Sequence, residues 1–164
     1  MRSLILCLLL AAVQIAQADD QRFSLPAQEH RYGSHIMRGN AATSLIPFDK
    51  GYQELTTDQQ ALVRAEYESM GPEDEPPFPL RGLKKLFHGA EEAAGIWPST
   101  GEMDIRVLVG ADGKALSARI YSTPDMDMAR ALAGLMLGEI YKPALCAGRA
   151  CAQEFRWRVK FKSE

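Results

Sequence analysis

The residues best suited to chemistry lie near the carboxyl terminus, where four residues separate Cys146 from Cys151. A four-residue connection containing Gly148 is typical of a hairpin loop, and it would place the two cysteines opposite each other. Cross-strand Cβ atoms lie close to the distance that a disulfide needs. A zinc site would require two further ligands from elsewhere in the chain, and a redox pair is normally separated by two residues. We therefore predict a structural disulfide between Cys146 and Cys151, and we expect no metal and no cofactor.

The segment after the second cysteine alternates between aromatic and cationic side chains. Successive side chains of a β-strand face opposite sides of the sheet, so a strand over residues 153–162 would sort them onto two faces. One face would bury Phe155, Trp157, Val159 and Phe161, and the other would carry Arg156, Arg158, Lys160 and Lys162. We expect the cationic face to be the solvated side of the sheet. Attraction for an acidic partner or for a nucleic-acid backbone is the alternative interpretation.

Helical patterns precede this strand in the sequence. The spacing of Thr57 and Gln60 is typical of a capping box and predicts a helix over residues 57–70. Prolines exclude a helix from residues 73–79, EDEPPFP, which we predict to be a short extended connector. A second helix is predicted over residues 80–94. Its apolar stripe would consist of Leu83, Phe87, Ala90 and Ala94.

The pattern then changes to a period of two residues. Apolar and polar side chains alternate over residues 101–109 and 116–121, and the intervening Asp112-Gly113 pair is typical of a hairpin turn. Asp125 can cap a third helix over residues 126–140. Its apolar stripe would consist of Ala129, Leu132, Ala133, Met136 and Ile140. This order of elements predicts an α+β fold, with helices packed on one face of a small antiparallel sheet.

Residues 1–18 have the layout of a secretory signal peptide. Arg2 precedes a run of Leu, Ile, Ala and Val, and the run ends at Ala16-Gln17-Ala18, a small-x-small cleavage pattern. The run is shorter than a membrane-spanning helix requires. We expect cleavage after Ala18 and a periplasmic protein with no stable membrane insertion. An uncleaved segment that anchors the protein in the inner membrane is the alternative. Export also brings the two cysteines into an oxidising compartment, where disulfides persist.

The net charge and the motifs limit the classes of function that this protein can have. The chain has 19 Lys and Arg against 21 Asp and Glu, so a global basic field for nucleic acid is absent and we expect no nucleic-acid partner. The sequence contains no nucleophile elbow, no HExxH pair and no Ser, His and Asp set that spacing can identify. We therefore expect a protein that is not an enzyme. A small secreted enzyme is an alternative that would need a cleft in which His88 and a carboxylate converge.

Residues 75–162 resemble the C-terminal domain of the TonB energy-transducer family. The similar features are a strand, an Asp-Gly turn, a second strand, a helix, the junction Tyr141 to Ala144, a hairpin at Gly148 and an aromatic last strand. The resemblance implies a binding module whose last strand is an exposed edge. In that family the edge pairs with a peptide segment of an outer-membrane transporter, which is recognition by strand addition. The corresponding partner-binding residues are Gln153, Arg156, Arg158, Val159 and Lys160.

The chain departs from the family by lacking a long proline-rich spacer. Seven extended residues reach only about 20 Å, so we expect no force transmission across the periplasm. The predicted organisation is a signal peptide (1–18), a flexible or loosely packed segment (19–56), a helix with an acidic linker (57–74) and a TonB-like domain (75–164). The partner would be a protein or peptide. An envelope structural or assembly protein that forms homodimers through the same sheet is the alternative function.

Overall fold

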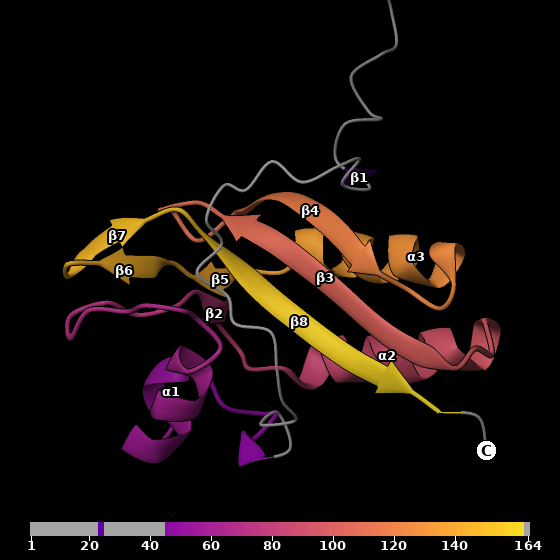
Figure 1. The fold of residues 1–164 in the computed structure, drawn as a ribbon, viewed down its shortest axis with the longest axis horizontal. Helices are drawn as coiled ribbons and strands as arrows, with labels where there is room; N and C mark the ends of the chain where they lie inside the picture. Colours follow the sequence, from indigo (N-terminus) through magenta and orange to yellow (C-terminus); the bar gives the residue numbers. More distant parts are fainter. Residues whose placement is uncertain (1–22, 25–44, 163–164) are drawn as a thin grey trace, which may run out of the picture.

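A four-stranded sheet forms the centre of the fold (Figure 1). The computed structural model describes residues 23–24 and 45–162, so the predicted signal peptide lies outside the described residues. The strand order is β1 (Phe23–Ser24), β4 (Ala115–Ser122), β3 (Gly101–Val109) and β8 (Gln153–Phe161). β4 and β8 both pair antiparallel with β3, whereas the short β1 pairs parallel with β4. The predicted α+β class is confirmed.

The β3–β4 hairpin turns at the predicted Asp-Gly pair. Gly113 has a φ of 80°, which few side-chain-bearing residues adopt without strain. A Cβ at this position would also lie 2.3 Å from the main-chain oxygen of Tyr141. The Asp112 carboxylate accepts a hydrogen bond of 3.1 Å from the Lys114 N–H, as expected of an Asx-type turn. Glycine is therefore required here both by the turn and by the packing against the segment at Tyr141.

Two helices cover one face of the sheet, α2 (Lys84–Ile96) and α3 (Met126–Leu137) (Figure 1). The side chain of Asp125 caps α3 by accepting a 2.8 Å hydrogen bond from the Met128 N–H. The predicted α3 stripe is buried except for Ile140, which lies beyond the end of the helix and is exposed. A Cβ at Gly89 would lie 2.4 Å from Leu135, so the two helices approach closely.

The second helix begins four residues later than predicted. Gly82 has a φ of 78° and the Gly82 N–H bonds to the Pro79 oxygen, so residues 79–82 form a turn before α2 starts. The rotation of the helix also differs slightly from the prediction. Its buried residues are Leu86, Ala90 and Ala93, whereas Phe87 and Ala94 are only partly buried.

The first helix, α1 (Thr57–Arg64), is shorter than predicted. Thr56, not Thr57, is the N-cap, and Gln59 completes the capping box. The chain turns after Arg64 because its guanidinium donates to the main-chain oxygens of Gly71 and Asp74 and so closes the loop between them. Tyr67 was predicted to lie on this helix. It lies instead after the end of the helix, and its hydroxyl contacts β8.

The proline-rich segment is extended as predicted, and it is part of the core. β2 (Phe78–Pro79) pairs antiparallel with β5 (Tyr141–Lys142), and Pro76 and Pro77 are fully buried. The ring of Phe78 lies 6.1 Å from that of Phe155 on β8, edge to face. Earlier in the chain the short 3-10 helix η2 (Tyr52–Glu54) places Tyr52 against Phe78, and the core also includes Ile46 and Leu55.

The Cys146–Cys151 disulfide is present, but its hairpin differs from the prediction. β6 (Ala144–Cys146) and β7 (Arg149–Cys151) are joined by a two-residue turn, and Cys146 pairs with Arg149 in the register. The cysteines are therefore diagonal neighbours, 5.9 Å apart at Cα, and the predicted four-residue loop is wrong. Ala147 and Gly148 both have positive φ, the conformation that a two-residue type I′ turn needs.

Contacts from an earlier loop hold this hairpin in place. The Asp74 carboxylate accepts hydrogen bonds of 2.7 Å from the Ala147 N–H and 2.6 Å from the Gly71 N–H. These two bonds, that from Ala147 first, lower the pKa of Asp74. Glu75 exchanges two main-chain hydrogen bonds with Leu145. The disulfide thus joins the two strands of the hairpin, and hydrogen bonds hold the hairpin against the loop that follows α1.

Candidate functional site: the outer edge of β8

The candidate binding site is the edge of β8 that faces away from β3. Among the described residues, β3 is the only strand that pairs with β8. In an antiparallel pair the main-chain groups of alternate residues point away from the partner strand. The Tyr67 hydroxyl donates a 3.0 Å hydrogen bond to the Glu154 main-chain oxygen, which identifies the even-numbered residues of β8 as the outward-facing ones. The outer edge is therefore formed by the main-chain groups of Arg156, Arg158 and Lys160.

Tyr67 closes the first part of this edge. Besides donating to Glu154, its hydroxyl receives a hydrogen bond from the Arg156 N–H. Burial raises the pKa of Tyr67 strongly, with smaller contributions from Glu66 and Glu154, while the bond from Arg156 acts in the opposite direction. The hydroxyl is therefore neutral at physiological pH and remains a donor. Within the described residues, the part of the outer edge that is left for a partner begins after Arg156 and consists of the N–H and C=O groups of Arg158 and Lys160.

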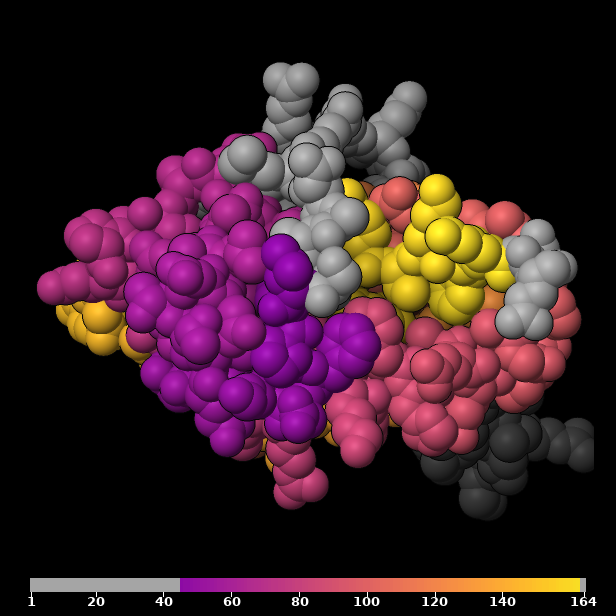
Figure 2. Space-filling model, turned by 90° about the horizontal axis from the view of Figure 1, so that it is seen from below, coloured from indigo at the N-terminus to yellow at the C-terminus, as the bar shows by residue number. Residues whose placement is uncertain are grey.

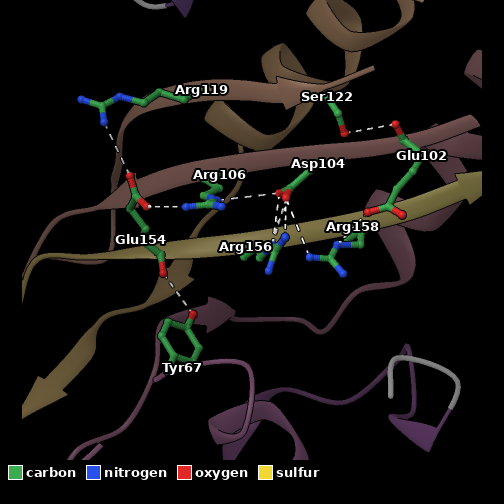
Figure 3. Close-up of polar contacts among 9 residues, drawn as sticks. All are labelled: Tyr67, Glu102, Asp104, Arg106, Arg119, Ser122, Glu154, Arg156 and Arg158. Atoms are coloured by element: carbon green, nitrogen blue, oxygen red, sulfur yellow. Dashed lines mark hydrogen bonds and ion pairs between the residues drawn. The ribbon is translucent and has the colours of Figure 1, made fainter. Parts of the chain in front are cut away.

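An ion pair on the face opposite the helices fixes the middle of the strand (Figure 3). The Arg156 guanidinium donates to the Asp104 carboxylate of β3 through Nε, at 3.2 and 3.1 Å, and through Nη2, at 2.5 Å. The exposed fractions of the two side chains are only 6% and 8%. A two-nitrogen contact of this kind is stronger and more directional than a single hydrogen bond. The expectation that the cationic face is simply solvated is therefore wrong at Arg156.

Further charges surround this pair (Figure 3). Arg158 Nε lies 3.0 Å from Glu102, and Arg106 and Arg119 each lie 3.9 Å from a different oxygen of Glu154. Arg106 also lies over the Tyr121 ring, 3.7 Å from its centre. Arg156 and Arg158 of β8 are thus matched by carboxylates of β3, and Glu154 of β8 is matched by arginines of β3 and β4.

Lys160 is the cation of β8 that lies outside this network of ion pairs. It is exposed, and it makes no ion pair within the part of the chain that the structure describes. The side chain of Arg158 is three-quarters buried. Its carboxylate partner, Glu102, is half exposed and therefore also contacts solvent. The positive charge of β8 is therefore accessible at the end of the strand where the main-chain edge is open.

The other face of β8 is anchored in the core. Phe155, Trp157 and Phe161 are buried, and the Trp157 ring meets Phe87 of α2 edge to face at 5.9 Å. Val159 is half-buried. Figure 2 shows β8, in yellow, reaching the molecular surface beside the pink atoms of the α2 region. The strand therefore combines a fixed inner face with an accessible rim.

The predicted site residues divide between these two faces. Arg156, Arg158 and Lys160 lie together on the polar face, and their main-chain groups point away from β3. Gln153 and Val159 lie on the helix-facing side and pair with Val109 and Met103 of β3 in the register. Their main-chain groups are used within the sheet, so only their side chains remain for a partner.

No protein-family model, curated protein or solved structure matches this chain. The site must therefore be interpreted from its own geometry. Within residues 23–24 and 45–162 no group of three or more His, Cys, Asp and Glu side chains could hold a metal, and no helix is long and apolar enough to cross a membrane. His88 is exposed and lies near Glu91 and Glu92 of its own helix.

Sequence reasoning missed Tyr67 and Asp104 as components of the site. The sequence contained a signal for Asp104, because this carboxylate lies on the polar side of the alternating strand and the cations of the last strand need counter-charges. The sequence contained no such signal for Tyr67, since a tyrosine at helical spacing from Val63 indicates a core position. What the completed arrangement can do is offer main-chain donors and acceptors, in fixed geometry and beside positive charge, to an extended segment.

Proposed function

We propose that this protein is an exported binding module, and not an enzyme, that captures a protein or peptide partner by adding the partner's strand to the outer edge of β8. The observation that carries the proposal is the pair of outward-facing residues, Arg158 and Lys160, on a strand whose apolar face is packed against the core. Exposed strand edges of this kind are normally protected or used. Main-chain hydrogen bonds would supply affinity and neighbouring side chains would supply selectivity.

The rigidity of β8 supports this function. A strand that must accept another strand should not rearrange when the partner arrives, because ordering a segment during binding costs conformational entropy. The Asp104–Arg156 pair fixes one face of β8, and Trp157 and Phe155 fix the other. The resemblance to the TonB C-terminal domain agrees with this mode. It suggests a segment of an outer-membrane transporter as one class of partner.

Export is part of the proposal. The leader-like sequence before Asp19 and the Cys146–Cys151 disulfide both fit a periplasmic protein. Mass spectrometry of the protein purified from the cell envelope tests this directly. We expect an amino terminus at Asp19 and a mass lower by two hydrogens than that of the reduced chain. A mature protein that retains residues 1–18, or that contains free thiols, would contradict the location.

The binding mode is tested by a pair of substitutions at one position. Lys160→Pro removes the outward N–H without breaking a bond to β3, since proline is tolerated where an edge N–H faces outward. Lys160→Ala is the matched control, because it removes the charge but keeps the N–H. Short peptides would first be selected from a random display library against the mature protein. Their affinities for both variants would then be measured by calorimetry.

We expect Lys160→Pro to bind the selected peptides roughly tenfold more weakly than Lys160→Ala, the effect of about one lost main-chain hydrogen bond. Circular dichroism and urea unfolding would establish that both variants fold. Equal affinities in two folded variants would exclude strand addition at this edge.

A further inference from the structure

We infer that the partner strand alternates acidic and apolar side chains, and that it is aligned by Tyr67 to the stretch of β8 beyond Arg156. This inference rests on the proposed function, because it specifies the partner of the same edge. The alternation follows from three properties of β8: the face on which each of its side chains lies, the charge of the polar face, and the point at which the edge opens.

An added strand would continue both faces of the sheet. Its side chains would alternate between the polar face and the helix face, as those of β8 do. Residues directly opposite each other on neighbouring strands share a face, with Cβ atoms about 4.5–5.5 Å apart. Partner side chains opposite Arg158 and Lys160 would therefore meet the polar face. Those between them would meet Val159.

Charge decides the first set of partner positions. Over the open stretch, β8 presents Arg158 and Lys160 on the polar face, followed by the exposed Lys162, and Arg158 lies 3.0 Å from the half-exposed Glu102. Asp104 adds only a contact of 4.0 Å to Arg158, because Arg156 already engages its carboxylate through two nitrogens. Carboxylates on the partner strand would complete this face with cross-strand pairs of opposite charge. Lysines or arginines there would be repelled.

Burial decides the type of side chain at the partner positions that face Val159. Val159 is half-buried and contacts the core, and its neighbours Trp157 and Phe161 are 2% and 7% exposed. An apolar partner side chain beside Val159 would remove the remaining exposed part of this side chain from water. A polar side chain there would lose solvation without gaining a partner. The partner strand is thus apolar toward the helices and acidic toward the cations.

Tyr67 sets the register. Its hydroxyl occupies the Glu154 oxygen and the Arg156 N–H, so a partner strand cannot pair with that part of the edge. The available main-chain groups start at Arg158, and the polar positions of the partner must align with Arg158 and Lys160. The same restriction disfavours a second copy of this chain as the occupant. Antiparallel self-pairing within the open stretch would set these cations against one another.

Three synthetic peptides test the inference, each long enough to span residues 156–162. The first alternates valine and glutamate, the second alternates valine and lysine, and the third has the composition of the first in an order without alternation. Binding to the mature protein would be measured at low and at high salt. We expect the first peptide to bind on the order of tenfold more tightly than either of the others, with a preference over the lysine peptide that salt reduces.

Two charge reversals localise the effect. Lys160→Glu should abolish the preference for the glutamate peptide over the lysine peptide. Lys84→Glu, an equal change in net charge at the exposed start of α2, should leave it intact. A preference that responds equally to both reversals would overturn the inference, because the discrimination would then arise from the net charge of the protein.

The outcome also separates this inference from the proposed function. If the glutamate and lysine peptides bind equally and Lys160→Pro weakens both, strand addition stands and the acidic partner is excluded. If Lys160→Pro affects none of the peptides that bind, the edge is not the binding site and both conclusions fail. If all three bind equally weakly while library-selected peptides depend on the Lys160 N–H, only the inference fails.

Discussion

Asp104 is the residue on which the geometry of β8 most depends. Its carboxylate is almost fully buried and is engaged by Arg156 through two nitrogens, with Arg106 at 3.8 Å. A buried charge that loses its partner keeps its desolvation cost. The pair therefore makes the strand sensitive to single substitutions at either end. In the proposed binding mode, the pair would serve to fix the position of the neighbouring Arg158.

Removing the charge of Asp104 tests the importance of this pair. Asp104→Asn keeps the shape of the side chain but leaves the Arg156 guanidinium without its counter-charge, and should lower the free energy of unfolding by about 3–5 kcal/mol. Glu102→Gln is the control at a half-exposed ion pair, where the expected loss is about 1 kcal/mol or less. Urea unfolding measures both. Equal losses would show that the buried pair has no special role.

The buried tyrosines make the stability of the protein depend on pH. Burial raises the pKa of Tyr67 and of Tyr141 far above the ordinary value of 10.0, so in the folded protein both hydroxyls stay protonated when the unfolded chain begins to ionise. Their contribution to stability is therefore complete below pH 10 and is lost as pH rises above it. Unfolding free energies measured at several pH values from about 9 to 11 should fall, and the fall should be less steep in Tyr67→Phe than in the native protein. An identical slope would show that Tyr67 ionises as freely in the folded state as in the unfolded one.

At the scale of elements, two glycines make a matched test of the turn and the helix. Gly113→Ala should destabilise the protein by more than about 1 kcal/mol, because the φ of 80° is strained for alanine and the added Cβ would meet the Tyr141 oxygen. Gly134 lies inside α3 with nothing within 4 Å of an added Cβ. Gly134→Ala should instead stabilise by about 0.5–1 kcal/mol. Thermal unfolding of the two variants should therefore shift in opposite directions, and shifts of the same sign would contradict this account.

Elements with a strong local period were predictable, and those shaped by distant contacts were not. The two-residue alternation of β8 and the Asp-Gly turn each determine a local structure, so the sequence located the last strand and the β3–β4 hairpin. The end of α1 depends on Arg64 reaching the oxygens of Gly71 and Asp74, a contact that no local pattern encodes. The two-residue turn of the disulfide hairpin depends on Ala147 taking a positive φ, which alanine rarely does.

The candidate site was predictable to the same extent. Alternation alone placed Arg156, Arg158 and Lys160 on one face and Val159 on the other. It could not show which of these residues direct their main-chain groups outward, because that depends on the pairing with β3 and is revealed by the Tyr67 contact. It also could not show that Arg156 is buried, since the burial depends on the carboxylate that β3 places beside it.

At the scale of the whole molecule, the open edge raises the question of self-association. Self-pairing through the stretch beyond Arg156 would oppose cations to cations, and like charges directly opposite each other are destabilising. We therefore expect the mature protein to be a monomer. Light scattering over a range of concentrations should give the monomer mass throughout. A dimer that Lys160→Pro dissociates and Lys160→Ala does not would instead favour an assembly protein that pairs through β8.

The most direct test of the account is residue-resolved amide hydrogen exchange by NMR on the free mature protein. The central claim is that the N–H groups of Arg158 and Lys160 point away from β3 and are open to a partner. We predict that these two amides exchange rapidly, while those of Trp157 and Val159, which pair with Ile105 and Met103, exchange slowly. Slow exchange at Arg158 and Lys160, equal to that of their neighbours, would contradict the claim.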